Sequence, residues 1–333
     1  MKILVLVSDV PGLSDDLTVE AKSGLDAFIT ADAIEGGLTD RGHTLARAVV
    51  RKSMLDALDG YDPREWLVYN LCETLEGEAY REAYVPAVLD AMGYTYTGST
   101  TPTLHRALNK AHTKRLLELH KLPTARYQVF ESADEPINVP FPAFVKPIAQ
   151  DASIGVSDRA VVHCESELRA QVNYVIKEMG EAALAEEFIE GREFNVAIWG
   201  NKPPCILPLA EIDFSRIRDP YRQIISYAAK WDESTFEYHH TYPDCPAIVD
   251  EPLAQQIRSV ALKAYKLLGC RDYGRVDLRV RDGRPYILEV NPNCGIAPDA
   301  GFVREARAGG YEFGAMVEQI ALFAAERMNK RKR

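Results

Sequence analysis

Residues 274–291 carry a dense set of side chains that could do chemistry. Two runs of alternating residues flank an Asp-Gly dipeptide at 282–283, which predicts a β-hairpin. Glu289 and Asn291 are two positions apart, so both side chains must point to the same face of their strand. Asp277 and Glu289 are separated by eleven residues. With that odd count, the two carboxylates share a face only if the loop is odd-numbered or the hairpin contains a bulge.

Such an arrangement would place two carboxylates and one amide oxygen at a single sheet face. Hard oxygen ligands of this kind suit Mg²⁺ that bridges phosphate oxygens, with water completing the octahedron. A solvated polar face of an edge hairpin is the alternative interpretation, because acidic residues are common on exposed strands.

A lysine and a polar loop form the second candidate segment. Lys146 ends an apolar run just before the polar loop at 149–158. Because burial of an unpaired charge is prohibitive, Lys146 must reach either water or an anion. The loop contains Ser153 and could cradle phosphate through its backbone N–H groups, although its core at 151–155 holds only one glycine. A strand-end lysine that simply extends into solvent is the alternative.

The third candidate segment is an acidic turn between two apolar strands. Glu186 lies in the first strand, Gly191 marks the turn, and Glu193 lies in the second strand. This pattern suits a hinge between two lobes, where carboxylates and backbone groups could bind adenine and ribose. Taken alone, an acidic turn of this kind is more often just part of the surface.

The elements that must position these residues fall into three groups. Alternating strands and helices over 1–99 predict a doubly wound α/β lobe with a parallel sheet. Residues 100–184 predict a small α+β lobe, and 185–333 predict a strand-rich lobe closed by helices. The segment 212–249 has little periodicity, which is typical of a functional lid or a disordered loop.

The individual elements follow from periodicity and turn residues. We expect strands at 2–7, 44–50, 66–71, 94–97, 126–131, 142–147, 159–163, 184–189, 193–199, 204–211, 274–281 and 284–290. We expect helices that end near 42 and cover 79–92, 101–107, 110–120, 165–179 and 250–268, with closing helices beyond 301.

Composition narrows the class of protein. The 333 residues are 47% hydrophobic and 26% charged, which is typical of a globular protein. A net charge of −10 argues against nucleic-acid partners. No apolar run approaches the roughly 18 residues needed to cross a bilayer. The six cysteines include no C-x-x-C pair, so we expect a reducing cytoplasm and neither a zinc site nor a disulfide framework.

The order and spacing of these segments resemble the ATP-grasp superfamily, and within it the D-alanine–D-alanine ligase branch. The resemblance covers most of the chain, and its most specific part is the pair Gly-Arg-Val-Asp at 274–277 and Leu-Glu-Val-Asn-Pro at 288–292. It implies an ATP-grasp fold of three lobes, with ATP held between the central and C-terminal lobes. It also implies ligation of a carboxylate to an amine through an acyl-phosphate, with ATP and Mg²⁺, which Mn²⁺ could replace.

The resemblance implies roles for individual residues. It places Mg²⁺ ligands at Asp277, Glu289 and Asn291. It places residues that bind ATP at Lys110, Lys146, Glu186, Ile189, Glu193 and Lys230. It implies catalytic roles for Arg275, the backbone N–H of Gly295, Lys230 on a mobile lid, and Ser153.

Several substrate-binding positions depart from the family pattern. The first serine of a Gly-Ser-Ser-x-Gly loop is Ala152, the tyrosine of the lid is Trp231, and a serine that binds the second substrate is Ala300. An aspartate expected before Lys110 is Asn109, and the N-terminal Ser-x-Glu segment has no clear match between residues 8 and 20. A site loses selectivity for a group when the donors for that group are lost.

We therefore expect amino-acid or peptide substrates other than two D-alanines, with a bulkier or less polar substrate near Trp231. A genuine D-alanine–D-alanine ligase is one alternative, and a degenerate nucleotide-binding protein without ligase activity is another. Dimers are common among similar ligases, so a homodimer is an expected assembly.

Overall fold

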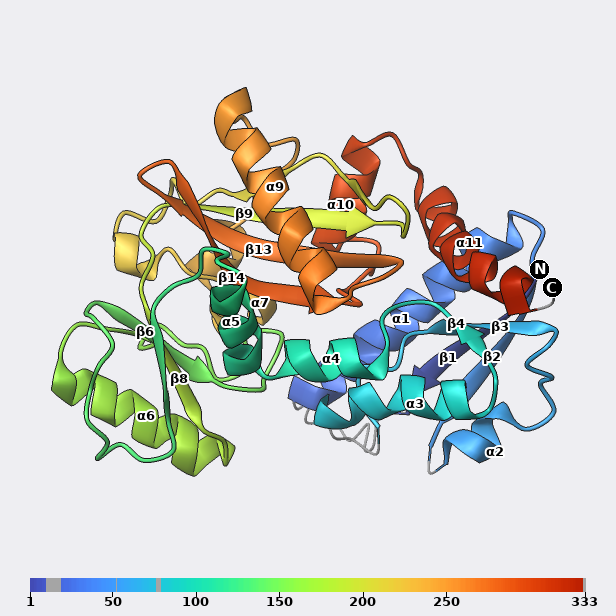
Figure 1. Cartoon of the computed structure of the whole chain (residues 1–333), viewed down its shortest axis with the longest axis horizontal. Coiled ribbons are helices and arrows are strands. Elements are labelled where there is room, and N and C mark those ends of the chain that lie inside the picture. The colour runs from blue at the N-terminus through green and yellow to red at the C-terminus, as the bar shows by residue number, and fades with distance from the viewer. Residues whose placement is uncertain (10–18, 52, 76–78, 332–333) are drawn as a thin grey trace.

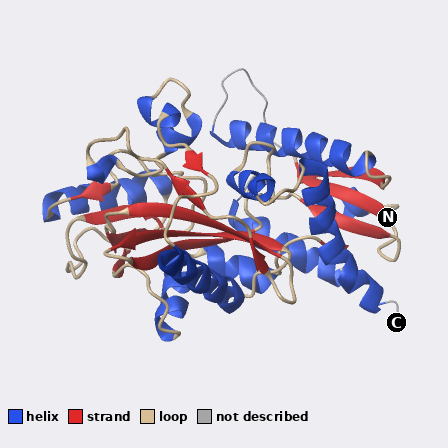
Figure 2. Cartoon of the chain, turned by 90° about the horizontal axis from the view of Figure 1, so that it is seen from above, coloured by secondary structure: helices blue, strands red, loops and turns tan. Residues whose placement is uncertain are grey.

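The computed structural model describes residues 1–9, 19–51, 53–75 and 79–331, and these residues contain three β-sheets (Figure 1). Figure 2 shows the short strands of the N-terminal sheet set apart from the long strands of the C-terminal sheet. The mixed α/β architecture with a parallel N-terminal sheet confirms the predicted fold class.

The N-terminal sheet is parallel, with strand order β2-β1-β3-β4. Its elements are β1 (Lys2–Ser8), α1 (Val19–Thr39), β2 (Thr44–Val50), α2 (Met54–Leu58), β3 (Trp66–Asn70), the 3₁₀ helix η1 (Ala79–Ala83), α3 (Tyr84–Ala91) and β4 (Thr95–Tyr96). Residues 3–7 of β1 are fully buried on both faces of the sheet, which is why this strand is a continuous apolar run. The helix predicted over 79–92 is instead the 3₁₀ helix η1 followed by α3.

The last helix of the chain returns to this first sheet. Helix α11 (Phe313–Arg331) falls within the predicted third lobe, yet it packs beside α1 on one face of the parallel sheet (Figure 1). The two helices approach closely at Gly37 and Gly314, because a Cβ atom on Gly37 would lie 3.0 Å from the Cα atom of Gly314. Helices α2 and α3 cover the opposite face.

The central sheet is antiparallel, with strand order β5-β8-β6-β7. Its elements are α4 (Thr101–Leu108), α5 (Lys110–Leu119), β5 (Tyr127–Phe130), β6 (Ala143–Pro147), β7 (Val161–Val162), α6 (Glu165–Met179) and β8 (Ala183–Glu187). Helix α6 spans the predicted range and ends at Gly180, whose φ of 67° gives the left-handed cap. Its apolar side packs on the sheet.

The C-terminal sheet has the order β12-β11-β9-β13-β14, and β10 also pairs with β9. Its elements are β9 (Arg192–Trp199), β10 (Cys205–Ile206), β11 (Ala210–Ile212), β12 (Pro243–Asp244), α9 (Glu251–Leu268), β13 (Tyr273–Arg281), β14 (Arg284–Pro292) and α10 (Gly301–Ala308). The strand predicted over 204–211 is divided into β10 and β11, and Pro208 between them has no N–H to donate to a sheet.

The segment 212–249 contains more regular structure than its sequence suggests. It holds the short elements η2 (Pro220–Arg222), α7 (Tyr227–Trp231) and α8 (Phe236–His239), in addition to β12. Each helix is short and begins at a polar cap, such as Ser226, whose hydroxyl accepts a hydrogen bond from the N–H of Ala229. The alternative of a disordered loop is therefore wrong.

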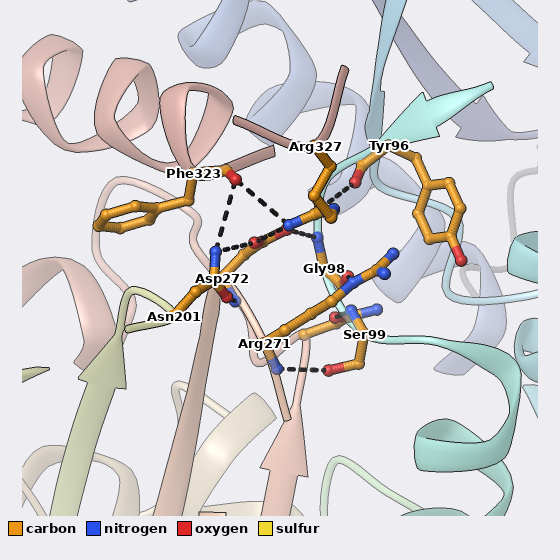
Figure 3. Close-up of polar contacts among 9 residues, drawn as sticks. Tyr96, Gly98, Ser99, Asn201, Arg271, Asp272, Phe323 and Arg327 are labelled. Carbon is orange, nitrogen blue, oxygen red and sulfur yellow. Dashed lines mark hydrogen bonds and ion pairs between the residues drawn. The ribbon is translucent and has the colours of Figure 1, made fainter. Parts of the chain in front are cut away.

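A buried ion pair joins α11 to both the N-terminal and C-terminal sheets (Figure 3). Asp272 is fully buried just before β13, and its two carboxylate oxygens accept hydrogen bonds from Arg327 at 2.5 and 2.6 Å. The same carboxylate accepts from the backbone N–H of Gly98 and from the amide of Asn201. Arg327 also donates to the carbonyl of Tyr96, so one network links β4, β13 and α11.

None of the helices that the structure describes is both long enough and apolar enough to cross a membrane.

Candidate active site

The β13–β14 hairpin brings the three predicted metal ligands to one face. Asp277 lies directly opposite Glu289, and the register then shifts so that Leu278 faces Ile287. This irregularity is the bulge that the odd spacing requires. The amide nitrogen of Asn291 donates to Asp277 at 2.8 Å and to Glu289 at 3.1 Å. The spacing argument is confirmed for the geometry of these three side chains.

These three side chains fit a magnesium ion whose remaining ligands are water and phosphate oxygens. Among the described residues, no group of three or more His, Cys, Asp or Glu side chains is arranged around a common point. Two carboxylates and one amide are an incomplete set of ligands, and such a set suits Mg²⁺ better than a complete shell of protein ligands would. Magnesium usually keeps several waters and is bound by one or two carboxylates together with the phosphates of a substrate.

Arg275 lies beside this site on β13. Its guanidinium donates to both oxygens of Asp277, at 2.6 and 2.8 Å. Asn195 on β9 donates to the same carboxylate at 2.8 Å. The sequence analysis did not single out Asn195, although it lies two positions after Glu193 and must share a strand face with it.

Positive charge gathers around Glu289. Burial alone would raise the pKa of this carboxyl, but Lys110, Lys146 and Arg275 together lower the pKa of Glu289 to about 2. These lysines therefore act on the same point as the predicted metal ligands. Glu289 is therefore ionised at neutral pH, as a metal ligand must be.

Lys110 begins α5 at the edge of the polar loop. Its ammonium donates to the carbonyl of Gln150 at 2.5 Å and lies 2.9 Å from a carboxylate oxygen of Asp151. The side chain of Asn109 caps this helix by accepting a hydrogen bond from the N–H of His112. Asparagine caps helices as well as aspartate does, so this departure from the family pattern costs no stability.

Lys146 belongs to a buried triad that the sequence did not reveal. Glu186 forms an ion pair with each of two lysines: one carboxylate oxygen lies 2.8 Å from the ammonium of Lys146, and the other lies 2.8 Å from that of Lys114. The side chains of Lys114 and Glu186 are only 1% and 4% exposed. Both oxygens of the predicted adenine-binding residue are thus paired with lysines. Lys114 follows Lys110 by four positions, and nothing in the local sequence separates it from a surface lysine.

The turn between β8 and β9 and the start of β9 hold the other predicted nucleotide residues, Ile189 and Glu193. Gly191 has φ 137°, and a Cβ atom there would lie 2.0 Å from the carbonyl oxygen of Val280, so only glycine fits. Arg279 on β13 donates to the carboxylate of Glu193 at 2.8 Å and to the carbonyl of Ile189 at 3.0 Å. The sequence analysis missed Arg279, which fixes both residues.

The lid segment lies against the polar loop. The hydroxyl of Ser153 donates to the carbonyl of Ile225 at 2.8 Å, and the N–H of Tyr227 donates to the carbonyl of Val156. The indole N–H of Trp231 donates to the carbonyl of Ala152 at 3.1 Å. Lys230 is exposed, and its ammonium lies 5.1 Å from the centre of the Trp231 ring.

One of these contacts gives Trp231 a partner inside the protein. Trp231 occupies the position of a tyrosine, and its indole N–H donates to the backbone carbonyl of Ala152. A serine at position 152 would offer the same carbonyl, so the contact does not explain the alanine. Since an indole offers one donor, Trp231 has no further hydrogen bond to give a substrate.

Two pockets adjoin the hairpin. Gly295 and Cys294 line the first, together with Glu73, Glu82 and Asn293. Lys110, Asp151, Glu289 and Asn291 line the second, which Glu82 also borders. Burial raises the pKa of the Cys294 thiol to about 12, so this side chain is a neutral wall of the pocket.

The three sheets and the crevice that joins the lysines to the hairpin define a protein of the ATP-grasp fold. The D-alanine–D-alanine ligase of Bacillus anthracis complexed with ATP has the same fold, with a TM-score of 0.76, 20% identity and coverage of 99% of each chain. Residues 116–321 match the family described as D-ala D-ala ligase C-terminus.

Full-length relatives agree with this assignment. The chain is 30% identical over 323 residues to a D-alanine–D-alanine ligase of Desulforudis audaxviator, covering 95% of this chain and 97% of the relative. It is also 30% identical over 298 residues to an uncharacterized protein, y4sG, of Sinorhizobium fredii, covering 87% of this chain and 85% of the relative. The chain belongs to the D-alanine–D-alanine ligase family and is an ATP-dependent ligase.

Proposed function

We propose that this enzyme joins the carboxylate of one small molecule to the amine of an amino acid or peptide through an acyl-phosphate. The observation that carries the proposal is the convergence of Lys110, Lys146 and Arg275 on Glu289. A site that combines three cations with two carboxylates and an amide suits the binding of a polyphosphate together with a divalent metal.

The residues have separate roles in this proposal. Lys110, Lys146 and Lys230 bind phosphate oxygens, and Asp277, Glu289 and Asn291 would hold Mg²⁺, which neutralises charge on the phosphates when bound. Glu186, Ile189 and Glu193 border the nucleotide. Ser153 supports the closed lid through Ile225.

The chemistry needs two displacements. A carboxylate oxygen of the first substrate attacks the γ-phosphorus of ATP, and ADP leaves. The amine of the second substrate then attacks the carbonyl carbon of the acyl-phosphate, phosphate leaves and the amine loses a proton. Arg275 and the N–H of Gly295 stabilise the oxyanion of this second step. The lid excludes water, which would otherwise hydrolyse the intermediate.

We further propose that the enzyme works on small molecules in the cytoplasm, as a homodimer, and that its lobes divide near residues 99 and 184. No disulfide is found among the described cysteines, which are free thiols. Gel filtration with light scattering would test the dimer.

The second substrate is expected to differ from D-alanine. Ala300 caps α10 with no side-chain hydrogen bond, so it offers no donor for the carboxylate of a small amino acid. We expect ATP turnover with D-alanine alone to be slower than with a better pair from a panel of amino acids and dipeptides. Release of ADP, with mass spectrometry of the product, measures this directly.

The same screen distinguishes the alternatives. Efficient formation of D-alanyl-D-alanine, with no better pair in the panel, would make the protein a genuine D-alanine–D-alanine ligase. If ATP binds but no pair releases ADP, the protein is a nucleotide-binding member of the family without ligase activity.

The Trp231–Ala152 contact should hold the lid closed. Trp231→Phe removes the indole N–H and keeps an aromatic ring beside Lys230. A neutral hydrogen bond contributes about 0.5–1.5 kcal/mol, so the open fraction of the lid should rise by about 2- to 13-fold. Hydrogen exchange of residues 152–156 and 225–231 should accelerate accordingly, and more ADP should be released per molecule of ligated product.

Trp66→Phe, on β3, is the matched control and should change neither measurement. Unchanged exchange in both segments of Trp231→Phe would show that the indole N–H does not hold the lid.

A further inference from the structure

Arg279 joins three segments that are far apart in the sequence. The residue is only 4% exposed, and its guanidinium donates to the carboxylate of Glu193 on β9 and to the carbonyl of Ile189 in the turn between β8 and β9. A third hydrogen bond goes to the carbonyl of Gln223, which lies in the lid segment at 212–249. One buried cation therefore contacts both the expected nucleotide residues and the lid.

Two aromatic rings flank the guanidinium. Phe188 from the turn and Phe214 from the lid segment have ring centres 5.0 and 5.7 Å from its central carbon. A guanidinium at such a distance is attracted to the face of an aromatic ring. Arginine suits this position because its rigid fork carries five N–H donors, whereas lysine presents its donors from a single nitrogen. Only an arginine can hold the three acceptors at once.

The charge of Arg279 also acts on Glu193. Burial raises the pKa of the Glu193 carboxyl, and the guanidinium of Arg279 opposes that rise. The two side chains depend on each other, since removal of either partner of a buried ion pair leaves an uncompensated charge. A ligand group that binds Glu193 therefore acts on Arg279 as well.

On the lid side, Gln223 leads into the part of the segment that contacts the polar loop. Its side-chain amide donates to the carbonyl of Ile217 at 2.8 Å, which fixes the backbone that the guanidinium contacts. Two residues later, the carbonyl of Ile225 accepts a hydrogen bond from Ser153. Helix α7 follows and carries Lys230. The contact at Gln223 is thus an anchor for the lid.

We propose that Arg279 is a positioning residue that couples the adenosine end of the nucleotide to the lid. Adenosine at Ile189 and Glu193 restricts two acceptors of the guanidinium, which lowers the entropic cost of holding the third acceptor, the carbonyl of Gln223. The lid is then ordered by the nucleoside itself, independently of any contact between Lys230 and phosphate. This inference rests on the proposed function, in which Ile189 and Glu193 border the nucleotide.

The test separates the two ends of ATP. Adenosine has no phosphates and is given to occupy the turn between β8 and β9, whereas inorganic tripolyphosphate with Mg²⁺ is given to occupy the lysines. Hydrogen exchange of residues 225–231 is measured in the full-length enzyme with each probe at saturation. We expect adenosine alone to slow this exchange by about 5-fold or more, the lower end of the usual coupling between two sites.

Arg279→Lys should abolish the effect of adenosine and keep the effect of tripolyphosphate, because the phosphate-binding lysines are unchanged. Since coupling is reciprocal, the variant should also bind adenosine about 5-fold or more weakly. Gln223→Ala should reduce the adenosine effect from the lid side, with every expected nucleotide residue still in place. Arg281→Lys is the matched control on the same strand, because Arg281 pairs with Glu187 on β8 and lies over the ring of Tyr286.

Equal effects of adenosine in the native enzyme and in Arg279→Lys would overturn the proposal. A loss of both probe effects in a folded Arg279→Lys variant would do the same, because it marks a purely structural role. If this variant does not fold, an unchanged adenosine effect in Gln223→Ala overturns the coupling.

The proposed function has a separate outcome. If adenosine binds the native enzyme in competition with ATP but leaves the exchange unchanged, the coupling is wrong and the nucleotide site stands. If adenosine and ATP do not compete, the placement of the nucleotide at Ile189 and Glu193 is wrong, and this inference is wrong with it.

Discussion

Arg275→Lys should lower the rate of ligation by about 10²- to 10³-fold, as removal of an oxyanion donor typically does. Lysine keeps the positive charge but lacks the planar fork of N–H donors of arginine. In the native enzyme that fork contacts both oxygens of Asp277, and we expect it also to contact the tetrahedral intermediate. The affinity for ATP should change little, because the phosphate-binding lysines remain in place.

Single-turnover kinetics would separate the two effects, and ATP binding would be followed by calorimetry. Arg284→Lys, in the exposed turn of the same hairpin, is the control and should keep native activity. Near-normal turnover of Arg275→Lys would remove this arginine from the mechanism. A large loss of ATP affinity would instead assign it to the nucleotide site.

The hairpin could be predicted from the sequence because its constraints are local. Side-chain alternation fixes the faces of Glu289 and Asn291. The odd spacing requires either an odd-numbered loop or a bulge to bring Asp277 opposite Glu289, and the structure has the irregularity between Asp277 and Leu278. Helix α6 could be predicted for the same reason, since its apolar period and Gly180 lie within one short window.

The partners of these residues could not be predicted, because they come from distant segments. Arg279 fixes Glu193 across 86 positions, and Asn195 reaches Asp277 across 82. No local pattern distinguishes a buried lysine such as Lys114 from an exposed one.

The packing of helix α11 could not be predicted from the sequence either. Its apolar residues predict a helix with a buried side, but a hydrophobic side does not identify the surface that covers it. Only the contacts with α1 and the parallel sheet show that the end of the chain completes the first lobe.

The structure changes the interpretation of Trp231. Its replacement of a tyrosine suggested an apolar surface for a bulky substrate. The structure pairs its N–H with Ala152, which is the other altered position. The indole N–H of Trp231 therefore has a partner inside the protein, so the case for a substrate other than D-alanine rests more on Ala300.

Arg327→Met should destabilise the protein by about 3–5 kcal/mol, because it leaves the buried carboxylate of Asp272 without its cation. The fully buried Asp272 keeps only its hydrogen bonds from Gly98 and Asn201, and the carbonyl of Tyr96 loses a donor (Figure 3). Since these contacts join α11 to both sheets, the loss should appear as a lower midpoint of denaturant unfolding.

Arg258→Met is the matched control for this variant. Its ion pair with Glu251 is exposed, so its removal should cost less than about 1 kcal/mol. The double variant Asp272→Asn, Arg327→Met should recover part of the stability, because it removes the uncompensated charge as well as its partner. If Arg327→Met were no less stable than Arg258→Met, the ion pair would not hold the lobes together. If the double variant were less stable than Arg327→Met, the cost would come from lost packing and not from a buried charge.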